Sequence, residues 1–508
     1  MLKQAAVVFF AVSIAVSVNA ADEEHHSHPV PEKLGSVTFE TSCAPKVKPA
    51  FERAVALLHS FAYSASEQAF RNVAAKDPGC AMAYWGMAMS HYHPLWAPPS
   101  GQELRAAAAQ IGKAVDLRAG SPRERQFIDA LAIYYRDAEQ SAPEVRAQRY
   151  ADAMARVAQD NSQDPEAQIF YALALIATAP PTDKTHANQK QAVAILEPLY
   201  RLQPQHPGLA HYLIHATDSA ELAQQGLAAA REYSKIAPSV PHALHMPSHI
   251  FTRLGLWDDS IASNGAARTA AHEQGDLGEE LHAMDYLMYA YLQRGRYADA
   301  GQLLRDLRTK TNIHAAEFKE GYASTAMPVR FVVEQRAWDS TASLEPLPNS
   351  PPHVAALVYW ARALGRTRGK PAGSADTEIA RLEDCGRQLQ SAGNKYWATQ
   401  VDVLLKEARA WQSQANGESE AAIRGLRSAA DEEDAIEKLP VTPGPIVPAR
   451  EQLGQLLLEL KRPEESLKEF QGALSAAPRR RGALAGAIAA AERLGNTQLA
   501  GQFRADYR

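Results

Sequence analysis

The chain has 508 residues, of which 46% are hydrophobic and 22% are charged, and its formal net charge is −5. A chain of this length is too long for one compact core, which favours several domains or a repeat array. The weak negative charge gives no electrostatic case for binding nucleic acid or an anionic membrane, because the only basic run, Arg479–Arg481, is explained by one solvated helix start.

The N-terminus has the pattern of a secretory signal peptide over residues 1–20. Lys3 is followed by an apolar run over residues 5–18, and Ala20 ends a cleavage site of small side chains. The run is too short to span a membrane, and no later stretch has 18 apolar residues in a row. We therefore expect a secreted, periplasmic protein that does not span the membrane. Residues 21–45 are expected to form a flexible tail, and its three histidines could bind metal or be incidental.

The chain contains three cysteines, Cys43, Cys80 and Cys385. In an oxidising compartment two of them can pair, and Cys43 and Cys80 lie one helical hairpin apart. The sequence therefore predicts a Cys43–Cys80 disulfide. Cys385 lies in a helical pattern and is expected to be a small buried apolar residue.

A helical repeat is visible over residues 450–478. Gly454 and Phe470 occupy positions of the 34-residue tetratricopeptide pattern, and Gly495 stands 34 residues after Lys461 at the same turn position. Small residues such as Gly454 let two antiparallel helices approach closely. The same pattern recurs upstream, with Phe70 and Gly86 in one place and Gly255 in another. Period-two alternation typical of strands is nearly absent. The predicted fold class is all-α: a solenoid of TPR-type helical hairpins in a right-handed superhelix.

Three structural units are expected after the tail. Residues 46–340 should form a TPR-like superhelix with a histidine-lined groove, and residues 341–439 an irregular helical region. Residues 440–508 should hold the last repeats, with the proline-rich stretch 440–448 as a stiff linker before them.

Two histidine pairs lie one repeat apart. His211 and His215 are spaced i, i+4, as are His245 and His249 thirty-four residues later, so each pair shares one face of its helix. At these repeat positions the side chains should face the concave groove from helices roughly 10 Å apart. Four imidazoles could then converge on one ion, at about 2.0–2.1 Å from each nitrogen.

Three interpretations of these histidines remain open. They could form a hydrogen-bonded polar groove, or they could bind a divalent transition metal, with zinc first and copper or iron as alternatives. In the third interpretation the groove binds an anionic peptide or small ligand directly. The pattern is less specific than an HExxH motif because no glutamate lies between the histidines.

Further polar side chains are expected along the same groove. Asp218, Asp285 and Tyr289 would be acid–base candidates if the site were catalytic. His91 and His93 could extend the groove chemistry, as could His59, or they could be satisfied histidines in aromatic packing. The acidic pair Glu279-Glu280 is better explained by the helix dipole. The expected groove residues are His242, His282, Asp218, Asp285, Tyr289, His91 and His93.

Three sequence blocks carry a family resemblance. They are "CAMAYWG" from Cys80, "HPGLAHYLIH" from His206 and "PHALHMPSHIFTRLG" from Pro241. With them the chain resembles a family of bacterial tetratricopeptide-repeat proteins, over roughly residues 37–338. The resemblance implies an exported or intracellular helical repeat protein with no assigned reaction. It also implies that the four paired histidines do more than pack, without naming their ligand.

Two functions follow as hypotheses. The first is an exported binding or scaffold protein whose concave groove holds a protein, peptide or small ligand, in one version around a His-bound metal. The alternative is a metal-dependent hydrolytic or redox enzyme that uses His211, His215, His245 and His249. A purely structural array without a ligand is a third reading. No GxSxG elbow, phosphate-binding glycine loop, CxxC or HExxH motif occurs in the sequence.

Overall fold

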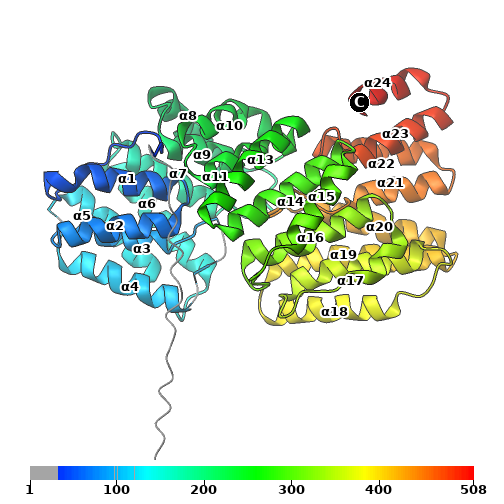
Figure 1. Ribbon diagram of the computed structural model, residues 1–508, viewed down its shortest axis with the longest axis horizontal. Coiled ribbons are helices and arrows are strands. Elements are labelled where there is room, and N and C mark those ends of the chain that lie inside the picture. Colours follow the sequence, from blue (N-terminus) through cyan, green and yellow to red (C-terminus); the bar gives the residue numbers. More distant parts are fainter. Residues whose placement is uncertain (1–31, 96–97, 100, 119, 508) are drawn as a thin grey trace, which may run out of the picture.

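The computed structural model describes residues 32–95, 98–99, 101–118 and 120–507. Over these residues the chain forms twenty-four α-helices and two short 3-10 helices, and no β-strand (Figure 1). The predicted all-α fold class is confirmed. The expected signal peptide, residues 1–20, and the tail histidines His25, His26 and His28 lie outside the described residues.

The helices follow one another with short connections. The first ten elements are η1 (Pro45–Val47), α1 (Lys48–His59), α2 (Tyr63–Lys76), α3 (Ala81–Ser90), α4 (Gly101–Asp116), α5 (Pro122–Tyr135), α6 (Pro143–Asp160), α7 (Pro165–Ala177), α8 (Ala187–Leu202) and α9 (Pro207–Ala216). The central elements are α10 (Ala223–Ile236), α11 (Pro241–His245), α12 (Pro247–Arg253), α13 (Trp257–Gln274), α14 (Leu277–Gln293), α15 (Tyr297–Arg308), α16 (Phe318–Glu334) and η2 (Trp338–Ser343). The last eight are α17 (Pro352–Arg368), α18 (Asp376–Ser391), α19 (Lys395–Ala415), α20 (Ser419–Asp434), α21 (Ala449–Glu459), α22 (Pro463–Ala476), α23 (Arg481–Arg493) and α24 (Thr497–Tyr507).

Helical hairpins are held together by close contacts at small residues. Gly86 on α3 lies against the ring of Phe70 on α2, and a Cβ at this glycine would come within 2.5 Å of the ring. Gly454 on α21 meets Phe470 on α22 in the same way, at 3.0 Å. The turn glycine Gly255, with φ of +66°, ends α12 in a conformation that side chains disfavour. The repeat positions identified in the sequence therefore act as close-packing and turn positions.

Neighbouring helices pack in chain order, and the superhelix also brings distant helices together. α9 contacts α1, and α14 contacts α23. Figure 1 shows α1–α7 at one end of the molecule and α17–α24 at the other, with α9–α14 between them. The central helices carry the paired histidines, so the candidate site lies between the two ends of the array.

The N-terminal segment departs from the expectation of a flexible tail. Residues 32–44 are extended and packed along the first helices, with the Ser36 amide donating to the carbonyl of Gln205 at 2.9 Å. Phe39 is fully buried among Phe51, Trp85 and Phe127, with ring centroids 5.4–5.8 Å away. This aromatic cluster holds the segment in place, and residues 21–31 of the expected tail lie outside the described residues.

Residues 341–439 were expected to form an irregular helical region, and the segment is helical but more regular than expected. The segment contains the four regular helices α17–α20, with Trp360 and Trp411 buried in their core. α17 begins at Pro352 and α19 at Lys395, 43 residues apart, and these longer hairpins do not match a 34-residue pattern. The expected domain boundary at residue 341 therefore falls within a continuous helical array.

The proline-rich stretch before the last repeats is not a simple linker. Residues 436–448, here called the strap, fold back across the inner side of the array. The Glu437 amide donates to the carbonyl of Pro181 at 2.8 Å, and the Leu439 amide donates to the hydroxyl of Tyr396 at 3.1 Å. Arg330 on α16 donates to the carbonyls of Pro445 and Gly444. Prolines keep the strap extended and leave its carbonyls available as acceptors.

The cysteines occupy the places expected for an oxidised chain. Cys43 and Cys80 form a disulfide, with their Cα atoms 4.7 Å apart, and Cys385 is a buried free thiol on α18. Within the described part of the chain no helix is both long and apolar enough to cross a membrane.

Candidate metal centre

Six histidines on four helices meet at the centre of the array. His211 and His215 lie on α9, His242 and His245 on α11, His249 on α12 and His282 on α14. α11 and α12 would be one helix if Pro247 did not interrupt it, since a proline has no N–H for the helical hydrogen bond. All six side chains are buried.

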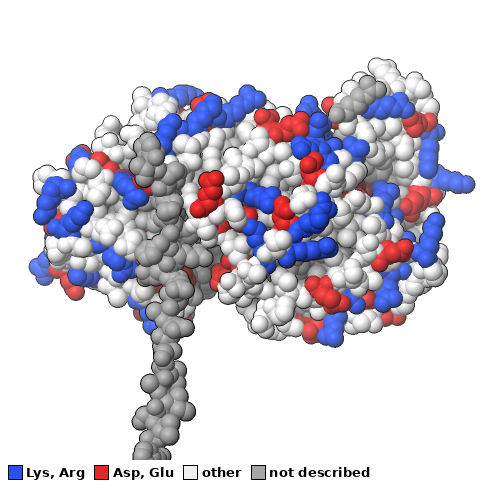
Figure 2. All heavy atoms as spheres, in the orientation of Figure 1, with Lys and Arg blue, Asp and Glu red and all other residues white. Residues whose placement is uncertain are grey.

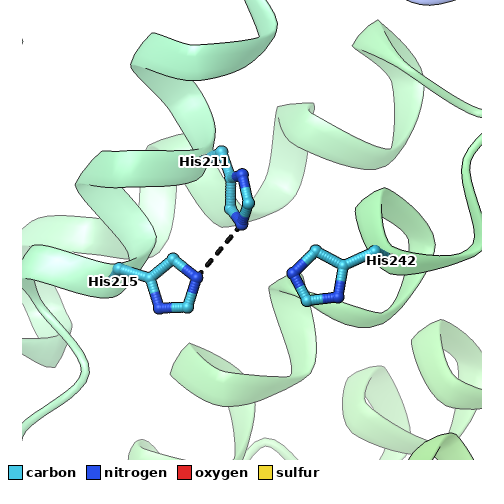
Figure 3. Close-up of side chains that lie close together, drawn as sticks. All are labelled: His211, His215 and His242. Atoms are coloured by element: carbon cyan, nitrogen blue, oxygen red, sulfur yellow. Dashed lines mark hydrogen bonds between the residues drawn. The ribbon is translucent and has the colours of Figure 1, made fainter. Parts of the chain in front are cut away.

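The imidazoles sort into two groups of three. The first triad consists of His211, His215 and His242, and the second triad consists of His245, His249 and His282. Within each triad the candidate ligand nitrogens all lie within 4.8 Å of one another. Figure 3 shows the first triad, with a ring nitrogen of His242 facing the space next to His211 and His215.

This grouping corrects the expected single site of four histidines. The sequence pairs His211/His215 and His245/His249 are both present, but each pair is completed by a different third imidazole. His242 joins the first triad and His282 joins the second, although both were expected only as groove residues. The ring centroids of His215 and His249 are 6.0 Å apart, so the two triads are direct neighbours.

In each triad two Nε2 atoms approach each other closely. They are 3.1 Å apart for His211 and His215, and 3.0 Å apart for His245 and His249. Nitrogens bound to one tetrahedral zinc ion at 2.0–2.1 Å are about 3.4 Å apart, so both spacings are slightly shorter than those of a metal-bound pair. A shift of a few tenths of an ångström would bring either pair to ligand geometry.

The other ring nitrogen, Nδ1, is anchored in four of the six histidines. His211 Nδ1 donates to the carbonyl of His59 at 2.6 Å, and His242 Nδ1 lies 3.3 Å from the carboxylate of Glu279. In the second triad, His245 Nδ1 lies 2.7 Å from the amide oxygen of Asn264, and His249 Nδ1 lies 2.8 Å from the carboxylate of Asp218. Metal-ligating histidines are held by partners of this kind, which fix the tautomer and orient the ring.

These anchors decide the tautomers of the second triad. Asn264 donates through Nδ2 to the carbonyl of Ser260 at 2.8 Å, which leaves its Oδ1 as an acceptor facing His245. His245 must therefore carry its proton on Nδ1, and His249 must do the same opposite the Asp218 carboxylate. Both Nε2 atoms then hold lone pairs that face each other at 3.0 Å. A cation between them, or one shared proton, would relieve this repulsion.

Burial keeps these imidazoles neutral. It lowers the pKa of His249 to about 4, and it holds the pKa of His245 and His282 well below the usual range, with neighbouring histidines adding to the effect for both. Burial also lowers the pKa of His211 and His215 strongly. A shared proton is therefore disfavoured at neutral pH, and the donor set suits a metal that prefers neutral nitrogen ligands.

The first triad does not impose the same conflict. His211 is fixed as the Nδ1–H tautomer by the His59 carbonyl, so its Nε2 is an acceptor. His215 can present a proton on its own Nε2 and donate it across the 3.1 Å gap. The tautomers of the first triad therefore allow a hydrogen-bonded pair, whereas the anchored tautomers of the second triad place two acceptors opposite each other.

Asp218 connects the second triad to the strap. Its carboxylate accepts from His249 and from Lys438 Nζ, both at 2.8 Å, and from Arg253 Nε at 2.9 Å. Burial alone would raise the pKa of Asp218, but the charges of Lys438 and Arg253 and the His249 hydrogen bond hold it well below its usual range. Lys438 belongs to the strap, and burial lowers its pKa to about 8.

A third cluster, formed by His59, Glu166 and His206, is a complete hydrogen-bond network. The Glu166 carboxylate accepts from His59 and His206, each at 3.0 Å. The second ring nitrogen of His59 accepts from the Tyr212 hydroxyl, and that of His206 accepts from the Leu209 amide. Every ring nitrogen has a compatible partner, so this cluster is satisfied as it stands and positions the His59 carbonyl for His211.

Other residues expected in the groove have different surroundings. Asp285 faces Arg330 at 3.6 Å, and the Tyr289 hydroxyl accepts from Arg480 at 3.2 Å, so both take part in buried ion networks. His91 lies 3.6 Å from the carboxylate of Glu67, and His93 packs on the ring of Tyr63.

Sequence reasoning missed several contributors to the site besides Asn264, Lys438 and Arg253. Tyr286, rather than Tyr289, packs on His245 and His249, and its hydroxyl donates to strap carbonyls. Phe61 stacks on the first triad at 4.4–5.7 Å. Glu279 was attributed to the helix dipole, but it contacts His242 and pairs with Lys319. The one available signal was that Glu279 lies three residues before His282, on the same helix face.

Comparison with known proteins gives a general likeness only. No protein-family model and no curated protein sequence match the chain. Among solved structures, the chain is similar to the human IFIT1 dimer with PPP-AAAA, at 12% identity and a TM-score of 0.37, covering 84% of this chain and 90% of that one. It is also similar to Naa15/Naa10 bound to HypK-THB, at 11% identity and a TM-score of 0.25, covering 90% and 69%. Likeness at this level says nothing about what the chain binds.

Proposed function

We propose that this chain is a helical-repeat binding protein that holds a divalent transition metal in its second triad, with the first triad as a neighbouring site. The observation that carries the proposal is the approach of the His245 and His249 Nε2 atoms to 3.0 Å while both Nδ1 protons are fixed on oxygen acceptors. Two lone pairs buried at this distance need a cation between them.

The chemistry of the donors favours particular metals. Imidazole nitrogens suit zinc, copper, iron and nickel, whereas calcium and magnesium require oxygen ligands. Zinc is the first choice because three neutral histidines form a common zinc donor set. Copper and iron are the alternatives. The second triad lies deep in the array, with all three side chains fully buried, which favours slow exchange of the ion.

The wider role supported by the fold is presentation of an inner binding surface, because repeat solenoids usually act in this way. On the face drawn in Figure 2 basic and acidic side chains are interspersed, so this face has no large field of one sign that would select a polyanion. Export is part of the proposal. The signal-like N-terminus and the Cys43–Cys80 disulfide support an oxidising compartment.

The test is metal content of the full chain after exhaustive dialysis against metal-free buffer. The expected result is at least one equivalent of bound metal in the purified protein, measured by elemental mass spectrometry. His245→Ala and His249→Ala should each remove that equivalent. His314→Ala, at an exposed position outside both triads, should leave the metal content unchanged.

Circular dichroism of each variant separates loss of the metal from loss of the fold. If His249→Ala does not fold, His245→Gln offers a second variant with a smaller change of volume. A folded wild-type chain that takes up neither zinc nor copper nor iron would refute the proposal. Retention of metal in both triad variants would move the site elsewhere and refute the assignment of residues.

A further inference from the structure

A cavity of about 600 Å³ adjoins the first triad. Its walls come from segments far apart in the sequence: the ends of α3, α7 and α9, parts of α5 and α6, and the strap. The loop Ala179–Pro181 and the strap residues Glu437–Pro440 form one side of it. This volume is within the range of pockets that hold small organic ligands.

The cavity reaches the candidate metal centre through His215. This side chain lines the cavity and is 8% exposed, whereas the other five triad histidines are at most 2% exposed. Asp218, whose carboxylate accepts from His249 in the second triad, lines the cavity as well. A ligand in the cavity would therefore meet the first triad before the second, and His215 would be its point of contact.

The cavity wall combines apolar surface with unpartnered polar atoms. Leu95, Ile176 and Leu439 contribute the apolar part, together with several prolines. Tyr92 Oη, His186 Nδ1 and Gln189 Oε1 also belong to residues that line the cavity, and these three atoms are buried without a hydrogen-bond partner. Buried polar atoms are normally paired, so a ligand that reached these three atoms through a small side-chain shift would satisfy them.

The acidic side chains next to the site are already paired before a metal is added. Asp218 and Glu437 are paired with Arg253, Lys438 and Lys184, and Glu279 is paired with Lys319. Glu144, the other acidic residue of the cavity wall, is exposed to solvent. A divalent ion held by three neutral imidazoles would leave two positive charges uncompensated in a buried site. Such a site favours an anionic ligand at an open coordination position.

We infer that this cavity binds a small organic carboxylate with an apolar or aromatic body, and that its carboxylate coordinates a metal held by His211, His215 and His242. The inference rests on the proposed metal binding and adds the class of ligand. The apolar wall receives the body of the ligand, and Tyr92, His186 and Gln189 bind its remaining polar groups. The second triad is enclosed and serves as the permanent site, whereas the first triad is open to ligand.

The experiment uses the full chain loaded with Co²⁺, whose visible absorption reports changes in coordination. Phenylacetate is the probe, acetate supplies the same head group without the ring, and phenylacetamide supplies the ring without the charge. We expect phenylacetate to change the spectrum and to bind at least about tenfold more tightly than acetate, because its ring is buried in the cavity. Phenylacetamide should leave the spectrum unchanged.

Two variants test the location. Ala177→Phe and Ala147→Phe each fill part of the cavity from its wall without changing a triad residue. Each should bind as much cobalt as the wild type and should lose at least about tenfold in affinity for phenylacetate. His215→Ala should remove the spectral response to the probe while the cobalt in the second triad is retained.

The outcomes separate this inference from the proposed function. If the chain binds no cobalt, zinc, copper or iron, the proposed metal binding fails and the inference fails with it. If the metal is bound but phenylacetate is no better than acetate, only the inference is overturned. It is also overturned if both cavity-filling variants fold, load cobalt and bind phenylacetate as tightly as the wild type.

Discussion

Asp218→Asn is the substitution that probes the central site most directly. The Asp218 carboxylate accepts hydrogen bonds from His249, Lys438 and Arg253 and is almost fully buried. The amide that replaces it has the same shape but no charge, and one of its two terminal groups is a donor. The variant therefore leaves Lys438 and Arg253 without their shared counter-ion, and it weakens the hold on the His249 ring.

The magnitude follows from the burial of the network. Removing one partner of a buried ion pair costs about 3–5 kcal/mol. We expect the lower value, about 3 kcal/mol, because Glu437 still lies 3.4 Å from Arg253 and supplies part of the missing charge. The cost is relieved when the strap opens and Lys438 reaches water, so strap opening should become roughly 100-fold more frequent. Loss of the ring anchor should weaken metal binding by about 10–100-fold.

Hydrogen exchange followed by mass spectrometry measures the first effect and metal titration measures the second. Peptides that cover residues 436–448 should exchange faster in Asp218→Asn, whereas peptides from α18 should be unchanged. Lys438→Met separates the two effects, since it frees the strap but leaves the Asp218–His249 hydrogen bond in place. It should speed strap exchange and leave metal affinity within a few-fold of the wild type.

Asp129→Asn is the matched control, because Asp129 is exposed on α5 and lies in the interior of that helix. It should behave as the wild type in both assays. Strap exchange in Asp218→Asn within about threefold of the wild-type rate would refute the argument that Asp218 holds the strap closed, since about 3 kcal/mol predicts a far larger change.

Three further predictions concern stability, each measured by chemical denaturation. Replacing both Cys43 and Cys80 by alanine should cost about 4 kcal/mol, because the bridge closes a loop of 37 residues; an unchanged midpoint would contradict this. Gly86→Ala should destabilise the fold by about 1–3 kcal/mol, because its Cβ would meet the Phe70 ring. Gly265→Ala, in open space on α13, should stabilise the fold by about 0.5–1 kcal/mol. If both substitutions changed the free energy of unfolding in the same direction, the packing argument would be contradicted. Burial lowers the pKa of His93 in the folded chain to about 4, below the value of 6.5 for an imidazole in the unfolded chain. As the pH falls, the unfolded chain therefore binds a proton at His93 before the folded chain does. The free energy of unfolding of the wild type should therefore fall as the pH drops below 6.5. His93→Gln lacks this group, so its free energy of unfolding relative to the wild type should rise by about 2 kcal/mol between pH 7 and pH 5. An equal difference between variant and wild type at both pH values would exclude this role of His93.

The local pattern of the sequence was enough to predict the helices and the histidine pairs. The spacing of His211 with His215 and of His245 with His249 places each pair on one helix face, and the 34-residue offset places both pairs on the inner side of the array. Gly86 and Gly454 likewise mark close helix contacts, since a larger side chain would meet Phe70 or Phe470. These features depend on the period of a helix and the size of one side chain, which are readable from the sequence.

Only the tertiary structure decided how the imidazoles are grouped and what encloses them. The break at Pro247 and the packing of α14 place His242 and His282 as the third members of the two triads. The sequence could not predict this, because the rotation of one helix relative to its neighbour is set by side-chain packing and not by spacing along the chain. The strap reaches Asp218 from 220 residues away through Lys438, and Asn264 fixes the tautomer of His245 through its own bond to Ser260. Contacts between distant segments of this kind have no local signature, because they arise only when the folded array brings those segments together.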